Sequence, residues 1–167
     1  MFYARFPRSM KDRDLRLRPL RIFDGPFMSI RLREEAILKA NGSSNPISSR
    51  WWVVWWWIRR TFVLAYCVEC DSKRIGFVGL HDLRLGKVVE ISMVLFDKDV
   101  RRIGYGSRVV AILSRNLKKY SIAERVIARV KTDNHISLSF VRKLGFVERG
   151  ISDDIVTLCL DLKSLRF

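Results

Sequence analysis

The chain has 167 residues, 49% of them hydrophobic, and a formal net charge of +15 at pH 7. This length predicts one domain over residues 1–167, since about 150 residues usually form a single core. With only 9 glycines and 4 prolines, the composition excludes disordered and collagen-like chains. The excess positive charge indicates a polyanionic partner, such as a phosphate-rich cofactor, nucleic acid or anionic lipid.

The cysteines and the apolar runs indicate a compartment. Three cysteines, an odd number, fit the reducing cytoplasm better than a disulfide-bonded secreted domain. Cys67 and Cys70 form a C-x-x-C without a second ligand pair at zinc spacing, and on a strand they face opposite sides, so we expect no metal. The apolar run Trp51 to Ile58 is shorter than the ~20 residues that span a bilayer, and no secretion signal precedes it. A cytoplasmic location and no membrane span are therefore expected.

The first third of the chain predicts few elements clearly. A strand is expected from Leu15 to Pro19 and a helix from Met28 to Lys39, followed by a polar loop from Ala40 to Ser49. All five tryptophans lie between Trp51 and Trp57 without alternation. This favours a buried helix over a strand, although a core, a pocket lining and an interfacial surface all remain open.

The central part predicts an antiparallel meander and a helix. Three strands are expected, at Thr61 to Glu69, Ile75 to Leu83 and Val88 to Phe96, because each apolar run is bounded by turn residues. The following helix carries apolar residues three and four positions apart from Val109 to Tyr120. It begins at a glycine-rich turn.

The last part predicts a strand, a helix and a hairpin. The strand runs from Arg125 to Val130, and the helix ends at Gly145, a residue suited to the left-handed position after a helix. Phe146 to Ile151 and Ile155 to Leu162 are then expected to pair across a Ser-Asp-Asp turn.

The sequence R-R-I-G-Y-G, from Arg101 to Gly106, lies between the third meander strand and the long helix. Main-chain N–H groups at a helix start lack partners and lie at the positive end of the helix dipole, so a glycine turn there can bind a pyrophosphate. The turn is neither a dinucleotide-binding fingerprint nor a Walker loop. The glycines could equally serve only a tight turn.

The strand from Glu90 to Phe96, the R-R-I-G-Y-G turn, its helix, the strand at Arg125 and the segment N-H-I-S-L-S-F-V-R-K-L-G-F resemble the GNAT superfamily of acetyl-CoA-dependent N-acetyltransferases. The resemblance covers roughly Leu15 to Leu162. L-R-L-R-P-L near the start is similar to the first strand of the subgroup that acetylates ribosomal-protein N-termini. The resemblance implies an α/β (α+β) single-domain acyl-CoA N-acyltransferase (GNAT) fold, with a mixed, mostly antiparallel sheet of about six or seven strands flanked by helices.

The same resemblance implies acetyl-CoA as cosubstrate. Its pyrophosphate would lie on main-chain N–H groups from Arg102 to Ser107, and its pantetheine between the strands at Met93 to Phe96 and Arg125 to Val130. The residues expected at the cofactor are Leu95, Phe96, Arg101, Arg102, Ile103, Gly104, Tyr105, Gly106, Ser107 and Asn134. Arg108 adds charge to this turn, although it could be an ordinary solvated arginine, and Asn134 could also be an ordinary helix N-cap.

Candidate catalytic residues follow from the family pattern. Glu90, which shares a strand face with Ser92, matches an acid that acts as base through a water. Ser137 could donate a proton to the leaving thiolate, or it could equally be a small helix residue that packs near a strand. Val141 stands where the family often has a tyrosine, which puts a tyrosine acid in doubt. A main-chain N–H near Leu95 or Phe96 would hold the oxyanion. The two histidines, His81 and His135, are expected to be surface or capping residues rather than bases.

The predicted activity is acetyl transfer by direct attack of a primary amine, foremost a protein N-terminal α-amine. Neutralising an α-amine at pH 7 costs about 1.1 kcal/mol, against about 4.6 for a lysine, which suits a site with one candidate carboxylate. A small-molecule amine acceptor is the alternative, though a polyamine would be repelled by the +15 charge. A non-catalytic acetyl-CoA-binding domain, or one with weak affinity for ribosomal RNA, remains a further alternative.

Overall fold

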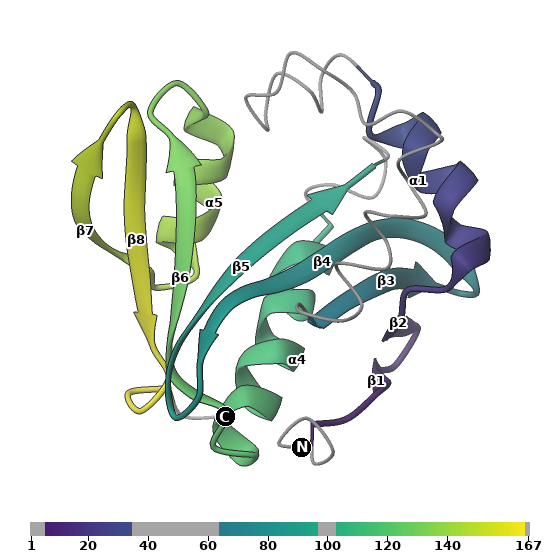
Figure 1. Cartoon of the computed structure of the whole chain (residues 1–167), viewed down its shortest axis with the longest axis horizontal. Helices are drawn as coiled ribbons and strands as arrows, with labels where there is room; N and C mark the ends of the chain where they lie inside the picture. Colours follow the sequence, from purple (N-terminus) through teal and green to yellow (C-terminus); the bar gives the residue numbers. More distant parts are fainter. Residues whose placement is uncertain (1–5, 35–63, 97–102, 166–167) are drawn as a thin grey trace.

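The computed structural model describes residues 6–34, 64–96 and 103–165. Within them one eight-stranded sheet has the order β1-β2-β3-β4-β5-β6-β8-β7 (Figure 1). The strands are β1 Met10–Asp12, β2 Leu15–Pro19, β3 Leu64–Cys70, β4 Lys73–Arg84, β5 Lys87–Leu95, β6 Ala123–Lys131, β7 Val147–Ser152 and β8 Ile155–Asp161. The helices are α1 Gly25–Arg31, α4 Tyr105–Lys119 and α5 His135–Lys143, with a 3-10 turn at Ile22–Asp24. The tryptophan cluster, the polar loop, Arg101 and Arg102 lie outside the described residues.

Within the described residues the predicted order of elements is confirmed, with two differences. The sheet has one or two more strands than expected, because the three-residue strand β1 pairs with β2. Helix α1 begins at Gly25 rather than Met28, with a proline in its first turn, where the missing N–H costs nothing. It ends at Arg31, short of the expected Lys39, because the next hydrogen bonds tighten to three-residue spacing, from Arg33 to Ile30.

One strand pair is parallel, and it is short. β5 pairs with β6 only from Lys87 to Glu90, opposite Ala123 to Ile127, whereas every other neighbouring pair is antiparallel. Beyond Glu90 the two strands diverge, and Figure 1 shows β5 leaning away from β6 toward α1. The sheet is therefore open between the second half of β5 and the second half of β6.

Helices cover both faces of the sheet. Helices α4 and α5 cover one face, where Val109, Leu113 and Leu138 belong to the same core cluster as Val68 and Val89 of the sheet. On the other face, α1 packs through Met28 on Cys67 of β3, Phe77 of β4 and Phe96, which follows β5. The two are called the α4–α5 face and the α1 face below.

The alternation predicted for the strands is confirmed by these two faces. Cys67 packs in the α1-face cluster and Cys70 against the α4–α5-face cluster, so the C-x-x-C cysteines lie on opposite sides of the sheet. Gly145 follows α5 with a φ of +87°, and β7 pairs with β8 across Asp153 and Asp154. None of the helices in the described residues is long and apolar enough to cross a membrane.

Candidate active site

Helix α4 begins within the predicted glycine turn. Gly104 is its N-cap with a φ of +94°, a conformation that favours glycine. The first helical hydrogen bond runs from the Arg108 N–H to the Gly104 carbonyl, at 3.1 Å. The N–H groups of Tyr105, Gly106 and Ser107 therefore lie in the first turn, which helical geometry leaves without carbonyl partners inside the helix. The positive end of the helix dipole adds to this site for an anion.

The second glycine of the motif serves close packing. A Cβ on Gly106 would lie 3.0 Å from the Phe140 ring of α5 and 3.4 Å from Met93 Cε of β5. Helix α4 therefore starts in close contact with both α5 and β5, beside the opening of the sheet. Ile103, the first described residue of this turn, is 62% exposed.

Tyr105 is fixed by a polar cluster at the sheet end. Its hydroxyl donates to Asp14 Oδ2 at 3.1 Å and accepts a hydrogen bond from the Cys70 thiol at 2.9 Å. The Cys70 thiol also lies 3.3 Å from Asp14 Oδ2. The side-chain atoms of Asp14, Cys70 and Asp71 that could ligate a metal ion lie within 4.8 Å of one another. Asp14, however, already accepts hydrogen bonds here. The absence of a metal stays a prediction.

Arg108 belongs to the same cluster. It donates from Nε to Asp12 Oδ2 at 3.0 Å and from Nη2 to Asp14 Oδ1 at 2.7 Å. This arginine holds the pKa of Asp14 well below its usual range, with a smaller contribution from the Cys70 thiol. The suggestion that Arg108 adds free positive charge to the turn is therefore corrected, because two carboxylates neutralise it. Arg101 and Arg102, the other arginines predicted at this turn, lie outside the described residues.

At the end of β5, the main-chain N–H groups of Leu95 and Phe96, both predicted as donors to the oxyanion, point in different directions. The Phe96 N–H donates to the Ile75 carbonyl of β4 at 2.9 Å, and the Phe96 side chain is buried. Its N–H is thus engaged within the sheet, which argues against Phe96 as an oxyanion donor. In an antiparallel ladder successive residues direct their main-chain groups to opposite sides, so the N–H groups of Leu95 and Met93 point toward β6.

The start of α5 carries the other predicted residues. Asn134 is its N-cap and accepts a hydrogen bond from the Ser137 N–H at 3.1 Å, so the capping role is confirmed. Ser137 is half-buried in the first turn. Val141, which stands where the family often has a tyrosine, is buried in the core and offers no proton. The acid that protonates the thiolate must therefore be another residue.

Glu90 lines a pocket on the α1 face. This open pocket, of about 410 Å³, lies where β4, β5 and β6 meet. Its lining residues are Asp82, Leu83, Arg84, Val88, Glu90, Ile127 and Arg129. Arg129 Nη1 donates to Glu90 Oε2 and also lies 3.8 Å from Asp82 Oδ2. Burial raises the pKa of the Glu90 carboxyl, and the Arg129 charge offsets part of that effect.

His81 lies beside Glu90 and is partly exposed. The two residues are cross-strand partners on β4 and β5, and His81 Nε2 is 2.5 Å from the Ser92 hydroxyl oxygen. Sequence reasoning missed this pair because single-strand alternation does not give register. Counting back from the turn at Leu85 to Lys87 would suggest it, but an irregularity between His81 and Arg84 shifts that count.

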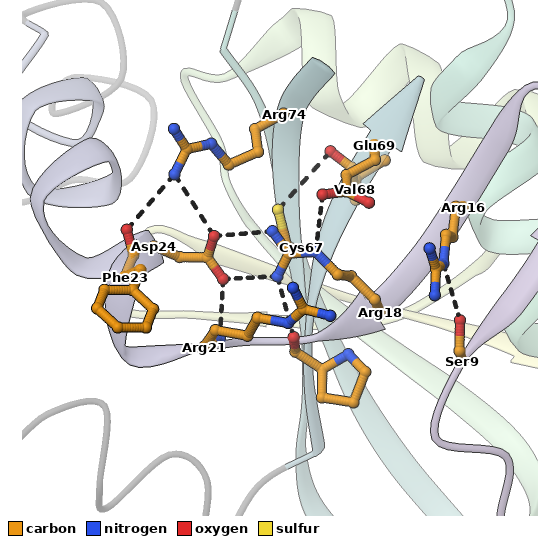
Figure 2. A network of polar contacts seen from close by, with 11 residues as sticks. Ser9, Arg16, Arg18, Arg21, Phe23, Asp24, Cys67, Val68, Glu69 and Arg74 are labelled. Carbon is orange, nitrogen blue, oxygen red and sulfur yellow. Dashed lines mark hydrogen bonds and ion pairs between the residues drawn. The ribbon is translucent and has the colours of Figure 1, made fainter. Parts of the chain in front are cut away.

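Buried ion pairs fix α1 over the same face of the sheet (Figure 2). Arg18 of β2 donates from Nη1 and Nη2 to the two carboxylate oxygens of Asp24, at 2.7 and 2.8 Å, and from Nε to Glu69 of β3 at 2.7 Å. Arg74 of β4 lies 3.5 Å from Asp24 and stacks over the Phe27 ring of α1. The start of α1 is thereby tied to three neighbouring strands.

Residues 32–146 match the sequence profile of the acetyltransferase (GNAT) family. The chain belongs to this family. The fold and the superfamily resemblance predicted from the sequence are thereby confirmed, and the protein is an acetyltransferase. No curated protein sequence matches the chain.

Solved structures with the same fold include two acetyltransferases that act on a ribosomal-protein N-terminus, the subgroup that the sequence is similar to. An acetyltransferase of Salmonella typhimurium that modifies the N-terminal serine of ribosomal protein L7/L12 superposes with a TM-score of 0.79 at 13% identity, covering 92% of this chain and 98% of that one. The ribosomal L7/L12 alpha-N-protein acetyltransferase RimL in complex with coenzyme A gives 0.78 at 15%, covering 93% and 97%. Spermidine N-acetyltransferase of Vibrio cholerae, with CoA and spermine, gives 0.75 at 16%, covering 91% and 98%.

Proposed function

We propose that this acetyltransferase moves the acetyl group of acetyl-CoA onto the α-amine of a protein N-terminus. The observation that carries the proposal is the opening between β5 and β6 beside the start of α4. The pyrophosphate would bind the N–H groups of Tyr105, Gly106 and Ser107, and the pantetheine would lie in the opening, near Leu95. Asn134 lies at the start of α5, which packs against α4 through Phe140 and Gly106.

The acceptor would enter from the α1 face of the sheet. The pocket that contains Glu90 adjoins the point where β5 and β6 separate, so an amine bound there could reach a thioester in the opening. The neutral amine attacks the acetyl carbonyl, a C–N bond forms, and the C–S bond breaks to release CoA thiolate. The Leu95 N–H would stabilise the oxyanion and Ser137 would donate the proton that the thiolate takes up.

Glu90 would draw the acceptor ammonium into the pocket and, as the sequence predicts, could receive its proton through a water. Its raised pKa moves this carboxyl toward the range of a general base. The ion pair with Arg129 favours the charged carboxylate, which suits electrostatic attraction of an ammonium group.

The charges in the pocket favour a protein N-terminus over a polyamine. Among the described residues that line it, two carboxylates, Asp82 and Glu90, are balanced by two arginines, Arg84 and Arg129. A polycation needs an acidic pocket to overcome a net charge of +15, whereas a peptide N-terminus carries a single positive charge. The similar ribosomal-protein acetyltransferases support this choice, and the similar spermidine acetyltransferase keeps a small amine as second candidate.

A charge at Ser107 tests the cofactor site. Ser107→Glu places a carboxylate in the first turn of α4, where the helix dipole tolerates it, so the fold should survive while the pyrophosphate is repelled. Acetyl-CoA at about 100 times its Kd should raise the free energy of unfolding of the wild type by about 2.7 kcal/mol. Ser107→Ala should keep this shift and Ser107→Glu should lose it. An equal shift with ATP and CoA would instead indicate a generic anion site.

A peptide panel tests the acceptor. Peptides with free N-termini should be acetylated, and the same peptides with blocked N-termini and an internal lysine should not. Faster transfer to spermidine or to an aminoglycoside would favour the small-molecule alternative. Affinity for ribosomal RNA, a single domain over residues 1–167 and a cytoplasmic location stay predictions.

A further inference from the structure

A serine and a histidine form a hydrogen-bonded pair beside the acceptor pocket. His81 Nε2 lies 2.5 Å from Ser92 Oγ, and the side chains come from neighbouring strands, β4 and β5. Ser92 is exposed and lies two residues beyond Glu90, the last residue of β5 that pairs with β6. The hydroxyl is therefore at the opening of the sheet, on the face from which the acceptor would arrive.

The charged groups around the pair come from three strands. Asp82 and Arg84 lie on β4 with His81, Glu90 lies on β5, and Arg129 lies on β6. Glu90 is directly opposite His81 in the ladder, and residues directly opposite have Cβ atoms about 5 Å apart. Gly79 of β4 is directly opposite Ser92, and Ala65 of β3 is directly opposite Gly79. Neither residue carries a charge.

We propose that Ser92 and His81 form a proton relay that removes the proton from the acceptor amine. The proposal rests on the proposed function, because it requires an amine acceptor in this pocket. Before the attack, one proton of the acceptor ammonium passes to Ser92 Oγ while the Ser92 hydroxyl proton passes to His81 Nε2, and the neutral amine that remains then attacks the acetyl carbon. The relay requires the tautomer of His81 that carries its proton on Nδ1, and on accepting the second proton His81 becomes an imidazolium. It later returns the proton to solvent, and the serine is unchanged.

The surroundings favour His81 over Glu90 as the final proton acceptor. Glu90 Oε2 already accepts a hydrogen bond from Arg129, so one of its two oxygens is engaged, whereas His81 Nε2 directly contacts the Ser92 hydroxyl. The charged Glu90 carboxylate across the ladder would then stabilise the imidazolium.

The test compares pH profiles of kcat/KM for an N-terminal peptide. In the wild type, the acidic limb should report the relay. In His81→Gln and Ser92→Ala, we expect a loss of about 100-fold at pH 6.5 that shrinks toward pH 9, because an α-amine of pKa about 7.8 is then neutral without a base. Ser92→Thr, which keeps the hydroxyl, should restore most of the rate.

Two controls separate the relay from folding and from the proposed function. His135→Gln removes the other histidine, an exposed residue of α5, and should leave the profile unchanged. The thermal shift with acetyl-CoA should be the same in all variants and the wild type, which shows that each is folded and binds cofactor. If His81→Gln keeps the wild-type rate and profile, the relay is overturned while the proposed function stands. If the wild type binds acetyl-CoA but acetylates no amine, the proposed function fails and the relay with it.

Discussion

Arg108 Nη2 donates to Asp14 Oδ1 at 2.7 Å, although the two residues are 94 positions apart. The contact joins the first turn of α4 to the turn between β1 and β2. Tyr105 and Cys70 meet Asp14 at the same place, so the glycine turn is followed by a helix start that is anchored to the sheet. An arginine next to the glycine-rich turn that we propose binds an anion therefore has a structural role here.

The first prediction concerns Arg108. Arg108→Gln should lower the melting temperature, because Asp12 and Asp14 lose their charged partner, and should change the affinity for acetyl-CoA less than about twofold. Calorimetric titration with acetyl-CoA at two salt concentrations, together with thermal unfolding, checks both parts. Arg115→Gln, an exposed position on the same helix, removes the same charge and is the control. A large loss of affinity specific to Arg108→Gln would show that Arg108 binds the cofactor.

The second prediction concerns the contact of α4 with α5. Gly106→Ala should destabilise the fold by about 1 kcal/mol, because the clash with Phe140 costs more than the roughly 1 kcal/mol gained in helix propensity. Urea unfolding measures the change. Gly106→Ala combined with Phe140→Leu should be less destabilised than the sum of the two single variants. Additive effects would show that the two residues do not clash.

Local pattern predicted most of the fold and only part of the site. The period of α4, the meander and Gly145 are set by neighbours in the sequence, so alternation and turn residues were sufficient. The partners of Arg108 and His81 depend on long-range register, which no local pattern contains. β1 was missed because three residues are too few to show alternation. The engaged N–H of Phe96 likewise depends on which side of β5 faces β4.

The third prediction concerns the buried pair of Arg18 and Asp24. Their side chains are 7% and 3% exposed, so Arg18→Met, which leaves the Asp24 charge buried, should cost about 3–5 kcal/mol in urea unfolding. The double variant Arg18→Met with Asp24→Leu should recover part of this loss, because the Asp24 charge is removed with its partner, although Glu69, 14% exposed, still loses its ion pair with Arg18. If the double variant is as unstable as the sum of its single variants, the two residues are not coupled.

The same pair should make stability depend on pH. Burial raises the pKa of Asp24, but hydrogen bonds from Arg18 and the Arg21 N–H outweigh it, so the net pKa is lowered. The folded protein then keeps Asp24 ionised at pH values where the unfolded chain, with a pKa near 3.9, binds a proton. The stabilisation should be complete well above pH 4 and decline as the pH falls below it. Unfolding of the wild type and the double variant between pH 3 and 6 measures the difference.

The last prediction separates attraction of the acceptor from proton removal. Glu90→Gln makes the pocket more positive by one charge, so the KM for an N-terminal peptide should rise about tenfold, the loss expected for a hydrogen bond to a charged group. Because burial raises the pKa of Glu90, the wild-type KM should start to rise on acidification at a higher pH than an ordinary glutamate, near 4.3, would produce, and the variant should lack this rise. Asp82→Asn, at a side chain that is 78% exposed, should change KM much less. If Glu90→Gln instead lowers kcat and removes the acidic limb of kcat/KM at unchanged KM, Glu90 is the base and His81 is not.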